Sequence, residues 1–194
     1  MAKEAPYIVP VRELPAHRRF EVPAALVTEW LRGLPMRDAL GAPDPDPQAG
    51  GGTAELDLYA DGQHVFAAGQ LRGHLVVACG RCVGPVRLEL DEKLRVTFMP
   101  PGEMPQEQEE GAADDGAEVR EEDLDTFPFD GERVDLEPML REQFVLAVPF
   151  APLCREDCKG LCPQCGIDLN TGTCACEKPV DPRLAALKGL KIPP

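Results

Sequence analysis

The sequence predicts an α+β protein: an antiparallel sheet or small open barrel with packed helices, followed by a C-terminal cysteine-rich knuckle. Apolar and polar residues alternate over long stretches in the middle of the chain, which is typical of half-buried strands. Two other stretches repeat apolar residues at helical spacing, and six of the eight cysteines fall within residues 154–176. With 194 residues, 43% of them apolar, the chain is long enough to bury one core and carry a small appendage.

The N-terminal region predicts a short strand over 7–14 and then a helix over 21–34. Pro23 falls where a proline belongs in the first turn of that helix. The apolar residues of the helix share one face: Leu26, Val27, Trp30, Leu31 and Leu34. Residues 41–52 are too rich in Pro and Gly to form an element, so they predict a linker.

Three strands are predicted next, over 53–60, 64–78 and 85–100. The second contains Gly69 and Gly73, which predict a bulge or a break in that strand. In the third, apolar residues alternate with charged ones, so one face of an antiparallel sheet is expected to meet the core while the other meets water.

The net charge of −14 is concentrated in one part of the chain. Residues 101–137 carry 15 acidic and two basic side chains, so the rest of the protein is nearly neutral. Residues 100–125 are also poor in large apolar side chains, which predicts an acidic, solvated loop or disorder. A chain of this charge is no general nucleic-acid clamp, because such proteins bind phosphates through basic patches.

Helical spacing returns over 135–150, with Asp135 as the expected N-cap. The apolar stripe of this helix consists of Leu136, Met139, Leu140, Phe144 and Ala147. A last short helix is predicted over 181–190, opened by an Asp-Pro pair. We therefore expect an α+β domain over 1–150 and a cysteine-rich extension over 151–194 that ends in this helix.

The eight cysteines form four closely spaced pairs beside Gly or Pro residues: Cys79/Cys82, Cys154/Cys158, Cys162/Cys165 and Cys174/Cys176. A structural zinc site commonly takes four cysteine ligands, so four pairs predict one or two Zn²⁺ ions. Because such ligation leaves no position open for water, this zinc is structural, and the C-terminal knuckle is a zinc knuckle. The glycines permit the tight turns that two-cysteine ligation needs.

The spacings favour one way of combining the pairs. Cys162/Cys165 and Cys174/Cys176 are separated by residues 166–173 only, so closing a local site costs little chain entropy. The other site would then join Cys79/Cys82 to Cys154/Cys158 across the sheet region. The sequence leaves open the alternative in which Cys154/Cys158 and Cys162/Cys165 form one site and the remaining four cysteines form the other.

No pattern in the chain indicates an enzyme. The three histidines have no ligand spacing, and no nucleophile elbow, P-loop, HExxH or dinucleotide-binding fingerprint is present. We therefore expect no catalytic residue and no small-molecule substrate. A CxxC thiol redox role for Cys79 and Cys82 is the rival hypothesis, although a redox CxxC normally opens a helix and this one lies between two predicted strands.

The first residues lack the apolar core of a signal peptide, and no run approaches the about 18 apolar residues of a membrane span. We therefore expect a cytoplasmic protein with reduced thiols and no membrane partner. Basic residues gather near the cysteines and are candidate contacts to RNA or a protein partner, or ordinary solubilising charges: Arg72, Arg81, Arg87, Lys93, Arg95, Lys159 and Arg183.

The motif CGRCV, an alternating strand and an acidic stretch precede GLCPQCG, an Asn-Thr-Gly turn and DPRLAALKGL. This order resembles the bacterial YceD-type large ribosomal RNA accumulation proteins, which have plastid relatives. The likeness covers residues 70–98 and 134–190, with Val83 standing where the family often has Leu.

The resemblance implies cysteine-bound zinc and a non-enzymatic, cytoplasmic role in the synthesis, processing or stability of the 23S rRNA of the large ribosomal subunit. Our working hypothesis is a ribosome biogenesis factor that binds large-subunit pre-rRNA or a large-subunit ribosomal protein. A zinc-stabilised protein–protein adaptor without RNA contact is the further alternative.

Overall fold

The computed structural model describes residues 6–32, 50–104 and 125–176. Its main sheet has the strand order β2-β3-β4-β5-β6, and every neighbouring pair is antiparallel except β5 and β6. The strands are β2 (Ala16–Pro23), β3 (Gly51–Asp61), β4 (His64–Ala78), β5 (Pro85–Met99) and β6 (Thr126–Pro128). A second, two-stranded sheet joins β1 (Ile8–Pro10) to β7 (Arg133–Asp135).

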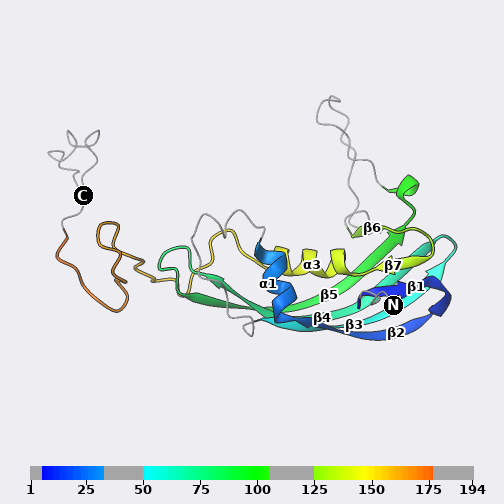
Figure 1. Ribbon diagram of the computed structural model, residues 1–194, viewed down its shortest axis with the longest axis horizontal. Helices are drawn as coiled ribbons and strands as arrows, with labels where there is room; N and C mark the ends of the chain where they lie inside the picture. The colour runs from blue at the N-terminus through cyan, green and yellow to red at the C-terminus, as the bar shows by residue number, and fades with distance from the viewer. Residues whose placement is uncertain (1–5, 33–49, 105–124, 177–194) are drawn as a thin grey trace, which may run out of the picture.

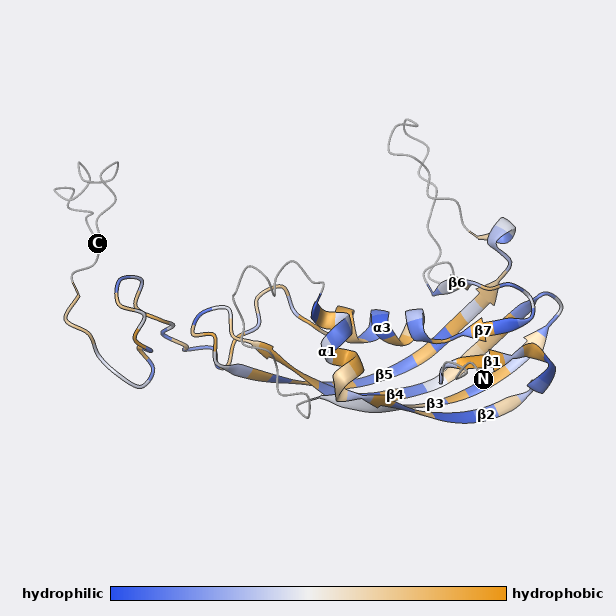
Figure 2. Cartoon of the chain, viewed as in Figure 1, coloured by the Kyte–Doolittle hydropathy of each residue, from blue (hydrophilic) through white to orange (hydrophobic). Residues whose placement is uncertain are grey.

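Helices α1 (Ala24–Arg32) and α3 (Glu137–Leu146) lie over the same face of the long, curved main sheet (Figure 1). Apolar residues of the strands and of both helices pack into one core cluster. In Figure 2, apolar and polar residues alternate along the strands, and both helices carry residues of each kind. Trp30 of α1 and Phe144 of α3 pack with ring centroids 5.8 Å apart, and the Trp30 indole N–H donates to Glu137 Oε1 at 3.2 Å. The α+β prediction is therefore confirmed, with an open, mostly antiparallel sheet.

The N-terminal prediction was wrong in one respect, because residues 16–23 form strand β2 and the helix begins only at Ala24. Pro23 therefore ends a strand and does not open a helix. Its missing N–H is tolerated because β2 is an edge strand that pairs with β3 alone. In the predicted 7–14 strand, only Ile8–Pro10 is extended, and a 3₁₀ turn follows at Val11–Glu13.

The predicted bulge or break at Gly69 and Gly73 is also wrong. Strand β4 keeps an unbroken antiparallel register with both β3 and β5. A Cβ at Gly69 would lie 1.9 Å from the carbonyl oxygen of Glu55, and one at Gly73 would lie 2.4 Å from that of Gly51. These glycines therefore allow two backbones to approach closely in a curved sheet, and they do not interrupt it.

Helix α3 follows its prediction closely. Met139, Leu140 and Phe144 are buried. The expected N-cap is wrong by one residue, because Leu136 precedes the first helical residue and makes no side-chain cap bond, although Asp135 Oδ1 accepts the backbone N–H of Glu137 at 3.0 Å. No helix among the described residues is long and apolar enough to cross a membrane. Residues 41–49 of the predicted linker, 105–124 of the acidic loop, and the predicted helix over 181–190 lie outside the described residues.

Candidate metal centres

The structure gathers all eight cysteines into two sets of four, in the arrangement that the loop lengths favour. The first cysteine cluster consists of Cys79, Cys82, Cys154 and Cys158. The second cysteine cluster consists of Cys162, Cys165, Cys174 and Cys176. Within each set, the sulfur atoms lie within 4.8 Å of one another, and all eight thiols are free.

In the first cysteine cluster, the loop that follows β4 supplies two ligands. The Cys79 N–H donates to the Gly84 carbonyl at 2.8 Å, and the Val83 N–H donates to the Cys79 carbonyl at 3.0 Å. Val83 has a φ of 62°, a left-handed conformation that is uncommon for a β-branched residue. The Gly80 N–H donates to the Pro152 carbonyl at 2.8 Å, which holds this loop against the segment that carries Cys154.

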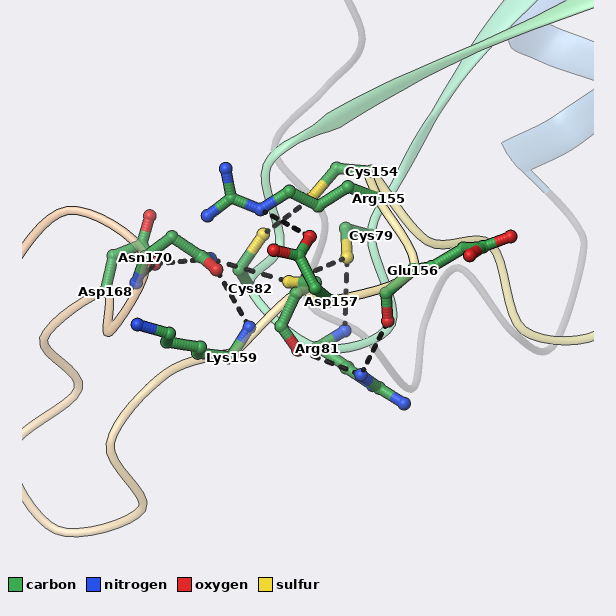
Figure 3. Close-up of polar contacts among 11 residues, drawn as sticks. Cys79, Arg81, Cys82, Cys154, Arg155, Glu156, Asp157, Lys159, Asp168 and Asn170 are labelled. Atoms are coloured by element: carbon green, nitrogen blue, oxygen red, sulfur yellow. Dashed lines mark hydrogen bonds and ion pairs between the residues drawn. The ribbon is translucent and has the colours of Figure 1, made fainter.

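Arg81 links the two halves of the first cysteine cluster (Figure 3). Its guanidinium donates to the carbonyl oxygens of Cys158 at 2.9 Å and Glu156 at 3.4 Å. Its own carbonyl accepts the N–H of Leu161 at 3.1 Å. Gly160, with a φ of 73°, packs against it so closely that a Cβ would lie 2.9 Å from the Arg81 oxygen. Arg81, which the sequence suggested as a contact to RNA or a protein partner, therefore holds the two loops of the first cysteine cluster together.

The second cysteine cluster closes on itself through a short loop. The Gly166 N–H donates to the Cys162 carbonyl and the Cys162 N–H donates to the Ile167 carbonyl, both at 2.9 Å. Gly166 has a φ of 71°, which a glycine adopts without strain. The Gly172 N–H donates to the Asp168 carbonyl at 2.9 Å, which turns the chain back toward Cys174 and Cys176. The turn expected within residues 166–173 is therefore present.

Asn170, in the loop between Cys165 and Cys174 of the second cysteine cluster, contacts the first cysteine cluster, a role that its position in a turn did not reveal (Figure 3). Its side-chain N–H group approaches Cys158 Sγ at 3.5 Å, while its Oδ1 accepts the backbone N–H of Lys159 at 2.8 Å. Asp168 Oδ1 in turn accepts from the Asn170 amide at 2.7 Å and so fixes its orientation. An Asn a few residues before a ligating Cys pair is the only sequence signal that could have indicated this outer-shell contact.

The donor set of each cluster fits Zn²⁺. In a tetrahedron with Zn–S bonds of about 2.3 Å, the sulfur atoms are about 3.8 Å apart. The Cys79 and Cys158 sulfur atoms are 3.8 Å apart, and those of Cys82 and Cys154 are 3.6 Å apart. Four sulfur donors and no carboxylate or imidazole make a closed, structural type of site.

The thiols of each cluster differ in pKa, because burial and neighbouring thiols oppose the ionisation of some of them while backbone N–H groups favour that of others. Burial raises the pKa of Cys79, but backbone N–H groups directed at its sulfur outweigh that effect and lower the pKa to about 6. Backbone N–H groups of Cys165 and Gln164 likewise lower the pKa of Cys162 to about 6. Burial and the neighbouring thiols raise the pKa of Cys154 to about 12. A bound divalent cation offsets this mutual repulsion and favours four thiolates.

Two of the candidate basic contacts on the main sheet are engaged in ion pairs. Arg72 of β4 donates to Asp91 Oδ1 at 3.3 Å and to Gln70 Oε1 at 2.8 Å. Arg87 of β5 donates to Glu89 Oε1 at 2.6 Å, and this hydrogen bond lowers the pKa of the Glu89 carboxyl. These arginines therefore belong to a mixed-charge face and do not form a uniformly basic patch.

Lys93 and Arg95 are exposed on β5 and make no ion pair with another described residue. Lys159 is exposed between the two cysteine clusters, with its backbone N–H on Asn170. Arg183 lies outside the described residues. The structure thus does not gather the candidate basic contacts into one site.

Residues 67–191 match the family described as large ribosomal RNA subunit accumulation protein YceD. An uncharacterized protein of Mycobacterium tuberculosis strain H37Rv is 34% identical over 139 residues, which are 71% of this chain and 61% of the relative. An uncharacterized protein of Mycobacterium leprae is 29% identical over 145 residues, 74% of this chain and 61% of the relative.

A chloroplastic YceD homolog 1 of Zea mays, a large ribosomal RNA subunit accumulation protein, is 31% identical over 80 residues. That match covers 41% of this chain and 27% of the maize protein. The chain spans 61% of the length of the mycobacterial relatives that it matches. No solved structure matches it. The family match includes all eight cysteines and both clusters, and the chain belongs to the YceD family of large ribosomal RNA subunit accumulation proteins.

Proposed function

We propose that the chain is a non-enzymatic ribosome biogenesis factor that supports the synthesis, processing or stability of the 23S rRNA of the large subunit in the cytoplasm. The observation that carries this proposal is the family match over residues 67–191, which spans both cysteine clusters. The family is named for accumulation of the large-subunit rRNA, and the matched region contains both four-cysteine clusters.

In this proposal, the first and second cysteine clusters each hold one Zn²⁺ ion through four thiolates. The zinc supplies structural cross-links, because all-cysteine ligation leaves no position for a substrate or a reactive water. The first ion fixes the end of β4 to the segment after α3, and the second shapes the extension over 151–194. We take this extension as a separate unit from the α+β domain over 1–150.

We propose that large-subunit pre-rRNA or a large-subunit ribosomal protein is the partner. Lys93 and Arg95 of β5, with Lys159 between the clusters, are the best candidates for an RNA contact because they are exposed and make no ion pair with a described residue. Arg72, Arg81 and Arg87 are less suited, since each already donates to acceptors within the chain. Arg183 remains in the proposed set on sequence grounds alone.

The test is a strain that lacks the gene, complemented with the wild-type chain or with a Cys79→Ser, Cys162→Ser double variant. We expect the ratio of 23S to 16S rRNA to fall in the deletion strain and to be restored by the wild type only. Co-sedimentation of the wild type with large-subunit precursors at low salt is expected as well. An unchanged rRNA ratio in the deletion strain and absence of the protein from every ribosomal fraction would sink the proposal.

Metal content separates this proposal from the CxxC redox alternative. We expect one zinc for each cluster, hence two per chain, and no thiol that reacts with a thiol reagent until a chelator is added. A protein without zinc whose Cys79 and Cys82 cycle between thiol and disulfide would instead favour the redox role. The adaptor alternative predicts protein adducts and no RNA adducts after crosslinking in cells.

A further inference from the structure

A groove with a volume of about 590 Å³ lies between the edge strand β6 and the exposed side of helix α3. None of the residues that line it is a cysteine of either cluster or one of the candidate basic contacts. Its apolar lining comes from Phe127 of β6 and from Pro138 and Val145 of α3. Val145 and Phe127 are also packed against the core, so this lining is held in place from beneath.

The apolar surface continues beyond the groove toward the C-terminal end of α3. Leu146, directly after Val145, is 69% exposed, and Phe150 four residues later is 90% exposed. These are the two most exposed large apolar side chains of the described residues. Isolated apolar residues on a surface are ordinary, but an apolar groove that continues into two such residues is typical of a docking surface.

The charges around the groove restrict what it can bind. Asp135, Glu137 and Glu142 line it, and Arg141 is the only basic side chain that does. The sequence of residues 105–124 contains nine acidic residues and one basic residue, which bears only on whether that segment could itself occupy the groove. Phosphates of RNA are repelled by such a surface, and the acidic segment is itself a poor occupant. Positively charged side chains are attracted to it.

We propose that this groove, together with Leu146 and Phe150, docks a basic, amphipathic segment of a partner protein. Apolar side chains of the segment enter the groove beside Val145, and its lysines or arginines face the carboxylates at the rim. A helix or an extended segment that presents apolar residues on one side and bases on the other has this chemistry. This inference rests on the proposed function, and of the two partners named there it selects the ribosomal protein, not the pre-rRNA, as the occupant of the groove.

The test uses the zinc-loaded full chain and a fluorescent 16-residue peptide of Lys and Leu with Leu at helical spacing. A scrambled peptide of the same composition and a Glu-for-Lys peptide are the controls. Fluorescence anisotropy at low salt reports the affinity, because salt screens exposed charges. We expect the patterned peptide to bind and the Glu-for-Lys peptide not to bind, with weaker binding by the scrambled peptide.

Neighbouring residues of α3 allow substitutions with opposite expected effects. Glu142→Lys should weaken binding about tenfold and Arg141→Glu should tighten it severalfold, because the two substitutions change the charge of the groove rim in opposite directions. Leu146→Ser should weaken binding about fivefold through lost apolar contact. All three side chains are exposed, so the fold should survive. Asp135 and Glu137 are left intact because Asp135 accepts the backbone N–H of Glu137 and the Glu137 carboxylate accepts the indole N–H of Trp30.

Glu55→Lys on β3 is the matched control, since its side chain points away from the core on the opposite face of the sheet. Equal weakening by Glu55→Lys and Glu142→Lys would overturn the proposal, because it would show general attraction to an acidic protein. Binding of a fluorescent single-stranded RNA 20-mer to the chain, weakened by Leu146→Ser as much as peptide binding is, would overturn it as well. Unchanged 23S rRNA in the deletion strain speaks against the proposed function, whereas the peptide affinities report on the groove alone.

Discussion

Each of the two cysteine clusters has four cysteine ligands, but the two clusters occupy different environments. The first cysteine cluster is built into the body of the protein, where Cys79 is 0% and Cys158 is 3% exposed and both pack with Val86. In the second cysteine cluster, only Cys162 is buried, at 6% exposed, and Cys165 is open to solvent. The first cluster therefore has two sulfurs inside a packed apolar environment, although Cys154 is exposed, whereas the second has only one buried sulfur.

The difference follows from chain length as well as burial. The halves of the first cysteine cluster are separated by 71 residues, those of the second by eight. Closing the longer loop costs about 2 kcal/mol more in chain entropy. The sheet and α3 must meet that cost before Cys79 and Cys82 face Cys154. The first cluster therefore depends on the tertiary fold and stabilises it in return, whereas the second is a local unit.

The largest expected effect comes from Cys79→Ser, compared with Cys165→Ser in the second cysteine cluster. Each variant should lose one zinc, measured by elemental analysis. Binding of a structural zinc is worth on the order of 10 kcal/mol in small domains, so Cys79→Ser should lower the unfolding midpoint by roughly 20–40 °C. The fluorescence of Trp30, the single tryptophan, follows the core. Cys165→Ser should shift that midpoint by only about 2 °C; equal shifts in both variants would refute the contrast.

A change in the sheet should act on one cluster only. Gly69→Ala places a Cβ where the Glu55 carbonyl oxygen is 1.9 Å away, so we expect the free energy of unfolding to fall by about 3 kcal/mol. During urea titration, the first cysteine cluster should lose zinc together with Trp30 unfolding, while the second retains it. Gly102→Ala, with no atom within 4 Å of the new Cβ, is the control and should be neutral. Simultaneous loss of both zinc ions in Gly69→Ala would show that the clusters are not independent.

Asn170 tests whether the clusters communicate. Asn170→Ala removes the contact to Cys158 Sγ and the acceptor for the Lys159 N–H. Outer-shell partners of zinc ligands affect metal affinity by about tenfold or more, so zinc affinity of the first cysteine cluster should fall about tenfold in competition with a chelating dye. Thr171→Ala, which removes only a 3.3 Å contact to the Asp168 carbonyl, should leave the affinity unchanged. A loss confined to the second cysteine cluster would contradict the link.

The smallest expected effect concerns the order of zinc release from the wild type. The second cysteine cluster is more exposed and opens without disturbing the core, so a chelator should remove its zinc about fivefold faster. Release should then follow two phases, monitored with a metal-sensitive dye. Cys165→Ser should abolish the fast phase and keep the slow one. A single phase in the wild type, or persistence of the fast phase in Cys165→Ser, would remove the kinetic part of the comparison.

The fold was predictable where a pattern was long enough to be read. Strands β3, β4 and β5 span 11 to 15 residues, and their alternation identified them. Strands β6 and β7 contain three residues each, which is too short for alternation to show. Strand β2 was missed because it ends in Pro23 and the apolar residues of α1 directly follow it, so the helical pattern extended too far toward the N-terminus.

The site was predictable in its residue types and less so in its supporting contacts. Cysteine spacing and loop length indicated both clusters, because short loops close locally and leave the remaining pairs to each other. Arg81 was expected to face a partner, yet it donates to two backbone carbonyls of the opposite loop. Asn170 carried no expectation beyond a turn. Contacts of this kind join segments far apart in the chain, and no local pattern records them.

The sequence by itself determined the three long strand segments, the two helix-forming segments apart from their ends, the donor type of both metal centres and the local closure of the second cysteine cluster. These depend on side-chain chemistry and on residues that are neighbours along the chain. Only the tertiary structure decided that Cys79 and Cys82 meet Cys154 and Cys158. It also decided that a groove with an apolar lining and acidic side chains around it lies beside α3. Those features depend on the path of the sheet, which the packing of the whole core establishes.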